Sequence, residues 1–301
     1  MATDRLLPAI VLRLVSVVFF AAMNAVIKLA QIHGASVAEI LFYRQFGAAL
    51  LVGSVIACGP GLRSVATQRI PAHIGRAIVG LSAMAFTFSG IVALPLAEAT
   101  TIGFSVPIFA TILGALILRE PTGWHRWVAV ATGFVGVLVV AQPGGAHVPV
   151  AGAACAVAGA LGTAAVSILL RRIGRTEAPL TTVFWFSTLS LVPMGLIYAQ
   201  VAQAHDRAAW ACLAGVGLLG GCAQIAMTWS LKLGPVTLVV PMDYSSLLWA
   251  TLFGWLIFGA LPPAATWAGA PIIIGSGLYI VWREHVRRRE ETRQAASQGL
   301  S

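Results

Sequence analysis

Long apolar stretches separated by short polar segments run along the chain from Leu7 to Trp282. A helix needs roughly 20 apolar residues to cross a bilayer, whose interior offers backbone amides no other partner. Only 10% of the 301 residues are charged and the mean hydropathy is +0.89, which no soluble globular domain of this length would show. The pattern predicts an all-α polytopic membrane protein with ten transmembrane helices, at residues 7–30, 36–58, 72–94, 96–118, 125–142, 148–170, 179–200, 208–230, 235–258 and 263–282.

The basic residues fall almost entirely on one side of these ten spans. Cytoplasmic segments hold an excess of Lys and Arg, so the charges set the orientation. With the N-terminus in the cytoplasm, the opposite side holds only Arg207. We therefore expect cytoplasmic N- and C-termini in a bacterial-type inner (plasma) membrane. The cytoplasmic segments then hold Arg5, Arg63, Arg69, Arg119, Arg126, Arg171, Arg172, Arg175, Lys232, Arg283, Arg287, Arg288, Arg289 and Arg293.

The same bias accounts for the formal net charge of +9. Because the basic residues sit at span ends and in a short tail, the charge indicates a lipid bilayer as partner and no nucleic acid. The tail, residues 283–301, is expected to be frayed and to touch anionic lipid.

A weak repeat relates the fourth and fifth spans to the ninth and tenth, which align without gaps when Pro95 is placed on Pro235. The shift puts five spans in each half, and an odd number makes the second half enter the membrane from the opposite side. We predict two inverted five-helix repeats, residues 1–145 and 146–282, followed by the basic tail 283–301. The identical pairs are Pro95/Pro235, Ser105/Ser245, Ala110/Ala250, Thr111/Thr251, Gly114/Gly254, Leu116/Leu256, Ile117/Ile257, Trp127/Trp267 and Leu138/Leu278.

Motifs for catalysis, metals or cofactors are not found. The four cysteines form no C-x-x-C, the six histidines show no H-x-x-x-H spacing, and no nucleophile elbow or Walker motif appears. The G-x-G-x-x-G run at residues 215–220 lies inside a span, where small residues let helices approach closely. An intramembrane enzyme or a receptor, the alternatives from other classes, would need a catalytic constellation or a signalling domain.

Several motifs together resemble the drug/metabolite transporter superfamily, specifically its ten-span EamA-type members. They are Ala97-Glu98-Ala99-Thr100-Thr101, Val106-Pro107-Ile108-Phe109, Leu118-Arg119-Glu120-Pro121 with Trp127, the second copy from Pro241-Met242-Asp243-Tyr244 to Phe258-Gly259-Ala260, and Glu39 with Phe42 and Arg44. The second copy departs from the family in having Ala260 where an exit Glu is usual, which weakens a transport role for that Glu. The resemblance implies two inverted five-helix repeats around a central cavity, and transport of amino acids or other small metabolites.

Charged residues inside spans cost several kcal/mol each and need a reason. Arg13 and Arg76 lie near cytoplasmic ends and are expected to snorkel. Lys28 and Glu39, near the outer ends of adjacent spans, are expected to form an ion pair that is structural or gates the outer side. Each lying about 12 Å from a span end, Arg44 and Asp243 approach the midplane. They pair with each other or bind the carboxylate and ammonium of an amino acid.

Further candidates for substrate binding are polar and aromatic residues at similar depth. Glu98 begins the fourth span, where an anion is stabilised by the helix N-terminus; a proton-coupling role is its alternative. Pro107 and Pro241 remove backbone hydrogen bonds and mark either hinges or static kinks. The remaining candidates, each of which could instead be a packing residue, are Asn24, Tyr43, Phe86, Phe88, Thr101, Phe104, Gln224, Trp229 and Tyr244.

The favoured hypothesis is a secondary transporter that exports an amino acid or another small metabolite by alternating access around a midplane cavity. Energy would come from the substrate gradient or the proton-motive force. The alternative keeps the fold and imports a nucleoside- or cofactor-like solute. Small residues on the fifth and tenth spans suit self-association and ordinary packing equally, so the oligomeric state stays open.

Overall fold

A computed structural model of the chain describes residues 6–117, 124–141, 149–173, 176–233 and 240–298. Every regular element in these ranges is helical. The elements are α1 (Leu6–Ile32), α2 (Val37–Cys58), η2 (Leu62–Val65), α3 (Ile70–Ala93), α4 (Leu96–Gly103), α5 (Val106–Ile117), α6 (Trp124–Ala141), α7 (Val150–Ile173), α8 (Pro179–Val201), α9 (Arg207–Leu233), η3 (Val240–Ser245), α11 (Ser246–Phe258) and α12 (Ala264–Gln298).

Six of the described helices are long and apolar enough to cross a membrane. They are α1, α2, α3, α7, α8 and α9, whose apolar stretches run over 21 to 26 residues. At 1.5 Å per residue, even the shortest of these is about as long as the hydrocarbon core is thick. Their positions agree with six of the spans that the hydropathy pattern predicts.

The segments predicted as the fourth and ninth spans are each divided in two. One continuous helix is expected over residues 96–118, but α4 ends at Gly103 and α5 begins at Val106. The described part of the ninth begins with a 3-10 helix, η3, and continues as α11.

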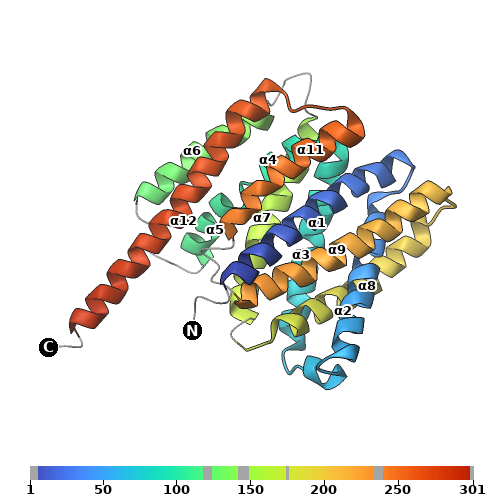
Figure 1. Cartoon of the computed structure of the whole chain (residues 1–301), viewed down its shortest axis with the longest axis horizontal. Coiled ribbons are helices and arrows are strands. Elements are labelled where there is room, and N and C mark those ends of the chain that lie inside the picture. The colour runs from blue at the N-terminus through green and yellow to red at the C-terminus, as the bar shows by residue number, and fades with distance from the viewer. Residues whose placement is uncertain (1–5, 118–123, 142–148, 174–175, 234–239, 299–301) are drawn as a thin grey trace.

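The described part of the C-terminal tail, residues 283–298, is helical, so the expectation that it is frayed is wrong there. α12 begins at Ala264 and continues to Gln298, and in Figure 1 its last part projects beyond the other helices. Residues 283–298 contain neither Gly nor Pro and are rich in Arg, Glu, Gln and Ala, which all favour helix.

The helices pack in pairs that are distant in sequence. α1 lies along α9, α3 along α7, α6 along α12, and α2 between α8 and α9 (Figure 1). Glycines permit the closest approach: a Cβ on Gly217 of α9 would lie 2.7 Å from the Tyr43 carbonyl oxygen of α2. The prediction that small residues in 215–220 serve helix packing is therefore confirmed.

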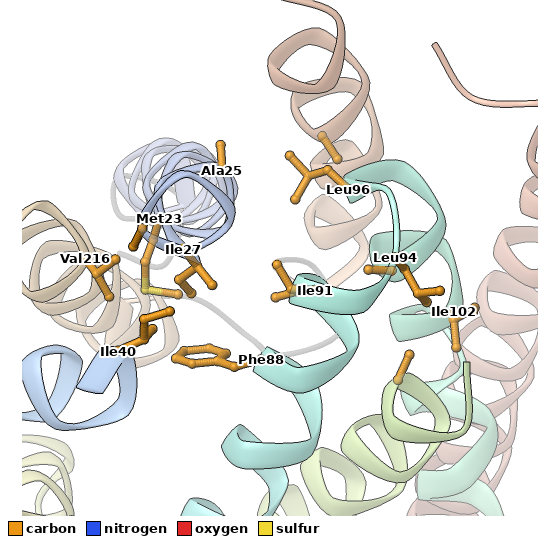
Figure 2. Close-up of a cluster of buried hydrophobic side chains, with 14 of the residues drawn as sticks. Met23, Ala25, Ile27, Ile40, Phe88, Ile91, Leu94, Leu96, Ile102 and Val216 are labelled. Atoms are coloured by element: carbon orange, nitrogen blue, oxygen red, sulfur yellow. The ribbon is translucent and has the colours of Figure 1, made fainter. Parts of the chain in front are cut away.

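An apolar core joins α1, α2, α3 and α9. Figure 2 shows Phe88 of α3 beside Ile27, Ile40 and Ile91, all buried. Because lipid is as apolar as these side chains, close packing rather than escape from water holds such helices together in a membrane.

The connections between helices meet at two ends of the bundle. At the N-terminal end, where α1 begins, Thr67 Oγ1 donates to Glu177 at 2.8 Å, and Arg69 donates to Thr176 Oγ1 at 2.7 Å. These bonds join the α2–α3 and α7–α8 connections. At the far end, where α1 ends, the α1–α2 and α8–α9 connections meet around Glu39.

Candidate functional site

Regular α-helical structure is interrupted between α4 and α5, and it changes from 3-10 to α between η3 and α11; a serine marks both places in the same way. Ser105 Oγ donates to the Ile102 carbonyl at 2.7 Å, and Ser245 Oγ donates to the Met242 carbonyl at 2.6 Å. Each hydroxyl satisfies a carbonyl where regular helical hydrogen bonding is interrupted. The shift that places Pro95 on Pro235 also places Ser105 on Ser245 and Ile102 on Met242, so the two breaks are equivalent in the sequence repeat.

Phe104 and Tyr244, the residues just before these serines, contact each other. Their ring centroids are 5.1 Å apart and the ring planes cross at 71°, the edge-to-face geometry that aromatic pairs favour. Phe104 is buried and Tyr244 is half-buried. Two of the predicted site residues thus meet, one just after α4 and the other in η3.

Pro107 and Pro241 each stand second in a helical segment. Pro107 is the second residue of α5, and Pro241 is the second residue of η3. At such a position the missing amide hydrogen is one that the helix leaves unpaired anyway. The break itself lies at Phe104–Ser105, before Pro107, so this proline begins a helix rather than kinking a continuous one.

Asp243 forms an ion pair with Arg13 of α1, not with Arg44. Arg13 Nε donates to Asp243 Oδ1 at 2.6 Å, and Arg13 Nη2 donates to Oδ2. The expected Arg44–Asp243 pair is therefore wrong, and so is the expectation that Arg13 snorkels. α1 packs directly against η3, which places Arg13 within reach of the carboxylate. The paired fork of two hydrogen bonds fixes both side chains.

Arg44 lies buried between α2 and α9, with amide oxygens as partners. Its Nη1 donates to Gln45 Oε1, and its Nη2 donates to Gln224 Oε1 at 3.2 Å. Its Nε and the Gln45 Nε2 have no hydrogen-bond partner among the described residues. Arg44 and Gln224, both predicted site residues, are thus brought together.

Arg76 of α3 is also buried, with its guanidinium 4.0 Å from the centroid of the Phe186 ring. Such stacking is a cation–π contact. Its Nε and Nη1 have no hydrogen-bond partner in the part of the chain that the structure describes. A Cβ on Gly80, one turn further along α3, would clash with Nη1. The guanidinium therefore points deeper into the bundle, and the expectation that Arg76 snorkels is wrong.

Lys28 of α1 faces the corner between α3 and α4. Its Nζ donates to the Leu94 carbonyl, and its charge interacts with that of Glu98. Glu98 is buried in the first turn of α4, as expected of an anion at a helix N-terminus. The expected Lys28–Glu39 pair is wrong, because each of the two residues has other partners.

Glu39 is held by the start of its own helix and by the α8–α9 connection. It completes a capping box with Ser36, whose amide donates to Glu39 Oε2 at 2.8 Å. The Gln203 amide donates to Oε1 at 3.3 Å, and His205 Nε2 lies 2.8 Å from the same oxygen. Its carboxylate therefore ties α2 to the neighbouring connection.

Asp206 joins the same connection to the end of α1. The Ala209 amide donates to Asp206 Oδ1 at 2.7 Å, and this hydrogen bond holds the pKa of the carboxyl below its ordinary value. His33 Nδ1 lies 3.3 Å from Asp206 Oδ2 and lowers that pKa further when protonated.

Tyr43 belongs to an aromatic group near the far end. Its hydroxyl lies 3.0 Å from that of Tyr198, and its ring meets those of Phe42 and Trp210 edge-on. Because Tyr43 is on α2, Tyr198 on α8 and Trp210 on α9, this group joins three helices.

The remaining predicted site residues are spread over the bundle. Thr101 is buried and its hydroxyl donates to the Ala97 carbonyl at 2.8 Å. Phe88 lies in the apolar core rather than beside polar groups (Figure 2). Asn24 is half-buried one turn before Lys28, while Phe86 and Trp229 are exposed.

Sequence reasoning misses or misplaces several polar residues of this region. Arg13 and Arg76 are expected to snorkel, but Arg13 pairs with the half-buried Asp243 and Arg76 points over Gly80. Gln45 and His205 are not singled out at all. The Ser36-x-x-Glu39 spacing is a capping-box signal and would have pointed Glu39 toward Ser36.

The described residues hold no group of three or more His, Cys, Asp or Glu side chains that could bind a metal ion. Away from the Glu39 network, the described charged groups include the Arg13–Asp243 pair, Arg44 with Gln45 and Gln224, Arg76 over Phe186, and Lys28 with Glu98. Fixed charges and amides at this depth suit the binding of a polar solute.

Comparison with known proteins gives consistent results. The chain is 29% identical to a riboflavin transporter of Vibrio cholerae over 90% of this chain and 92% of that protein. It is 25% identical to an S-adenosylmethionine uptake transporter of Rickettsia felis over 82% and 83%, and 24% identical to a pseudopaline exporter of Pseudomonas aeruginosa over 91% and 96%.

A protein of known crystal structure shares the fold. Its TM-score is 0.61 at 20% sequence identity, over 94% of this chain and 98% of its own. The model of the EamA-like transporter family matches residues 7–142 and again residues 150–282. With its apolar helices, this makes the chain a multi-pass membrane protein that transports a small molecule and is not an enzyme. The chain belongs to the EamA-like transporter family.

Proposed function

We propose that the chain is a secondary transporter built from two inverted halves, residues 1–145 and 146–282, which cross the membrane ten times. Helix starts related by the same shift as Pro95 and Pro235 support this: α5 begins at 106 and α11 at 246. The family model also matches once in each half. Inverted halves can exchange conformations and so open a site to either side in turn.

The orientation proposed from the basic residues places both termini on the cytoplasmic side of a bacterial inner membrane. The N-terminal end of the bundle is then the cytoplasmic one, and the Glu39 network lies outside. Labelling of single cysteines placed at Ala202 and at Ser301 tests this. Impermeant reagent should reach position 202 from outside and position 301 only in opened vesicles; labelling of both from one side contradicts the arrangement.

The substrate site is proposed where the two halves meet, at the Phe104–Tyr244 contact. This is the single observation that carries the proposal, because residues equivalent by the repeat touch only near the axis that relates the halves. Arg13 and Asp243 lie beside it on α1 and η3. Movement of α4–α5 against η3–α11 would then open the site alternately to each side.

Uptake of a cofactor- or nucleoside-like solute is the proposed activity. The named relatives that carry riboflavin and S-adenosylmethionine support it, since both solutes contain flat heteroaromatic rings, which suit a pair of aromatic side chains. Export of an amino acid or a related zwitterion is the second candidate. It is favoured by the charged pair Arg13–Asp243 and by the relative that exports pseudopaline.

Transport by proteoliposomes containing the purified chain separates these candidates. Uptake of labelled riboflavin or S-adenosylmethionine, faster than in empty vesicles and reduced by Phe104→Ala, supports the first. Uptake of labelled amino acids alone, with resistance of an overexpressing strain to toxic amino-acid analogues, supports the second. Unchanged rates after a pH gradient is collapsed would remove proton coupling from either.

A further inference from the structure

Two arginines are buried in the same region without an acid to neutralise them. Arg44 is 4% exposed and Arg76 is 7% exposed. The helices that carry them, α2 and α3, pack against each other. Neither forms an ion pair with a described acid: Asp243 is paired with Arg13, and Glu177 bonds Thr67.

Placing two like charges within a membrane bundle is costly unless an anion accompanies them. The cost would be reduced if the guanidinium groups reached a wet surface. Arg76 points the other way: its guanidinium fills the space over Gly80, which is further than Arg76 itself from the start of α3. Arg44 likewise lies against Gly220 of α9, the glycine that the sequence repeat aligns with Gly80. The arrangement therefore keeps both charges inside.

The unpaired atoms of Arg44, Gln45 and Arg76 are all hydrogen-bond donors. They are Nε of Arg44, Nε2 of Gln45, and Nε and Nη1 of Arg76, judged against all described residues. Buried donors normally have partners, so an acceptor is needed here. Water would supply oxygen atoms but would leave the two positive charges uncompensated.

We propose that Arg44, Gln45 and Arg76 bind an oxyanion, a carboxylate or phosphate group, between α2 and α3. Guanidinium forks match the paired oxygens of these groups, and the Gln45 amide supplies a further donor. That the oxyanion is part of the transported solute rests on the proposed function; the anion site itself does not. The solute would then carry at least one acidic group in addition to any ring.

Thermal unfolding of the purified full chain in detergent tests the site without transport. Its nine tryptophans report unfolding while sodium chloride is replaced by sodium phosphate or sodium acetate at constant ionic strength. The melting temperature of the wild type should rise saturably with the oxyanion. In Arg44→Gln and Arg76→Met the half-saturating concentration should rise by about tenfold or more, the loss of one charged hydrogen bond. Arg207→Gln, an exposed arginine on α9, should respond like the wild type.

Arg76→Met also separates this proposal from a purely structural role. Without oxyanion, removal of an uncompensated buried charge should raise the melting temperature above that of the wild type. If Arg76 served only to stack on Phe186, the variant would melt lower. Equal responses of the wild type to phosphate, acetate and chloride, or wild-type responses in both variants, would overturn the proposal.

Two further comparisons distinguish a phosphate from a carboxylate ligand, and the anion site from the proposed function. Saturation at lower phosphate than acetate indicates a phosphorylated solute, and the opposite order indicates a carboxylate; either supports the site. An oxyanion response with no solute uptake leaves the site standing and removes the proposed function. Solute uptake at wild-type rates in Arg44→Gln and Arg76→Met would show that the oxyanion is not part of the transported solute, and it would leave the proposed function standing.

Discussion

Phe104 and Tyr244 occupy equivalent positions in the two stretches that the sequence repeat aligns, and their rings touch at a centroid distance of 5.1 Å. Each precedes a serine that bonds the carbonyl three residues before it. A contact between equivalent residues places them near the axis that would relate two inverted halves. The aromatic pair is thus a structural marker of the proposed site.

Removing either ring should therefore disturb both stability and transport. Phe104→Ala and Tyr244→Ala should each destabilise the chain, and a double-mutant cycle should give a coupling energy of about 0.5–1.5 kcal/mol. Unfolding in mixed micelles measures it. Tyr244→Phe is the matched control, since it keeps the ring and removes only a hydroxyl that lacks a described partner. A coupling energy near zero would mean that the contact between the two rings does not contribute to stability.

The pair of Arg13 and Asp243 should be sensitive to loss of one partner and tolerant of loss of both. Asp243→Asn leaves a buried guanidinium without its anion and should destabilise by about 3 kcal/mol, the lower end for breaking a buried pair, since Asp243 is 41% exposed. The double variant Arg13→Met with Asp243→Leu should recover most of that loss. Denaturant unfolding of the single and double variants measures both values. A double variant no more stable than Asp243→Asn would contradict a direct pair.

Much of this architecture can be predicted from the sequence because it depends on length and period. Six apolar stretches become the long helices, and the shift that aligns Pro95 with Pro235 also aligns Ser105 with Ser245. Polar partners are harder to predict. Depth follows from counting residues along a helix, and it places Arg44 and Asp243 at similar levels. Whether two side chains touch depends also on the rotation of each helix and on which helix lies beside it. These place Arg13, not Arg44, against Asp243.

The wrong partner predicted for Glu39 and the wrong direction predicted for Arg76 both have local causes that can be read from the sequence. Depth alone matches Glu39 to Lys28, yet Ser36 three residues earlier offers a closer partner in the capping box. Arg76 is expected to reach toward the membrane end, yet Gly80 one turn further leaves room for it to point inward. Short-range spacing is the better guide in both places.

The contact between α2 and α9 should be intolerant of any added side-chain atom. Gly217→Ala would place a methyl group 2.7 Å from the Tyr43 carbonyl oxygen and should destabilise by about 1–3 kcal/mol, because backbone must move. Unfolding in mixed micelles measures this change.

The same substitution elsewhere on α2 provides the control. A Cβ on Gly53 would meet nothing within 4 Å, so Gly53→Ala should leave stability unchanged or raise it by up to about 1 kcal/mol through better helix propensity. Equal effects of the two alanines would show that the helices do not touch at Gly217.

The link between the α8–α9 connection and α9 should weaken in acid. Because the Ala209 amide lowers the pKa of Asp206 below its ordinary value of 3.8, the folded chain favours the ionised carboxylate. Its contribution to stability is therefore fully present above pH 3.8 and is lost as the pH falls through the lower folded-state pKa. Comparison of wild type with Asp206→Ala by thermal unfolding between pH 7 and pH 2 measures it: the variant should melt lower at pH 7 and match the wild type at the acid end. Asp206→Asn, which keeps a capping oxygen, should melt between the two at pH 7. A difference between wild type and Asp206→Ala that does not change with pH would show that the charge of Asp206 contributes nothing to this cap.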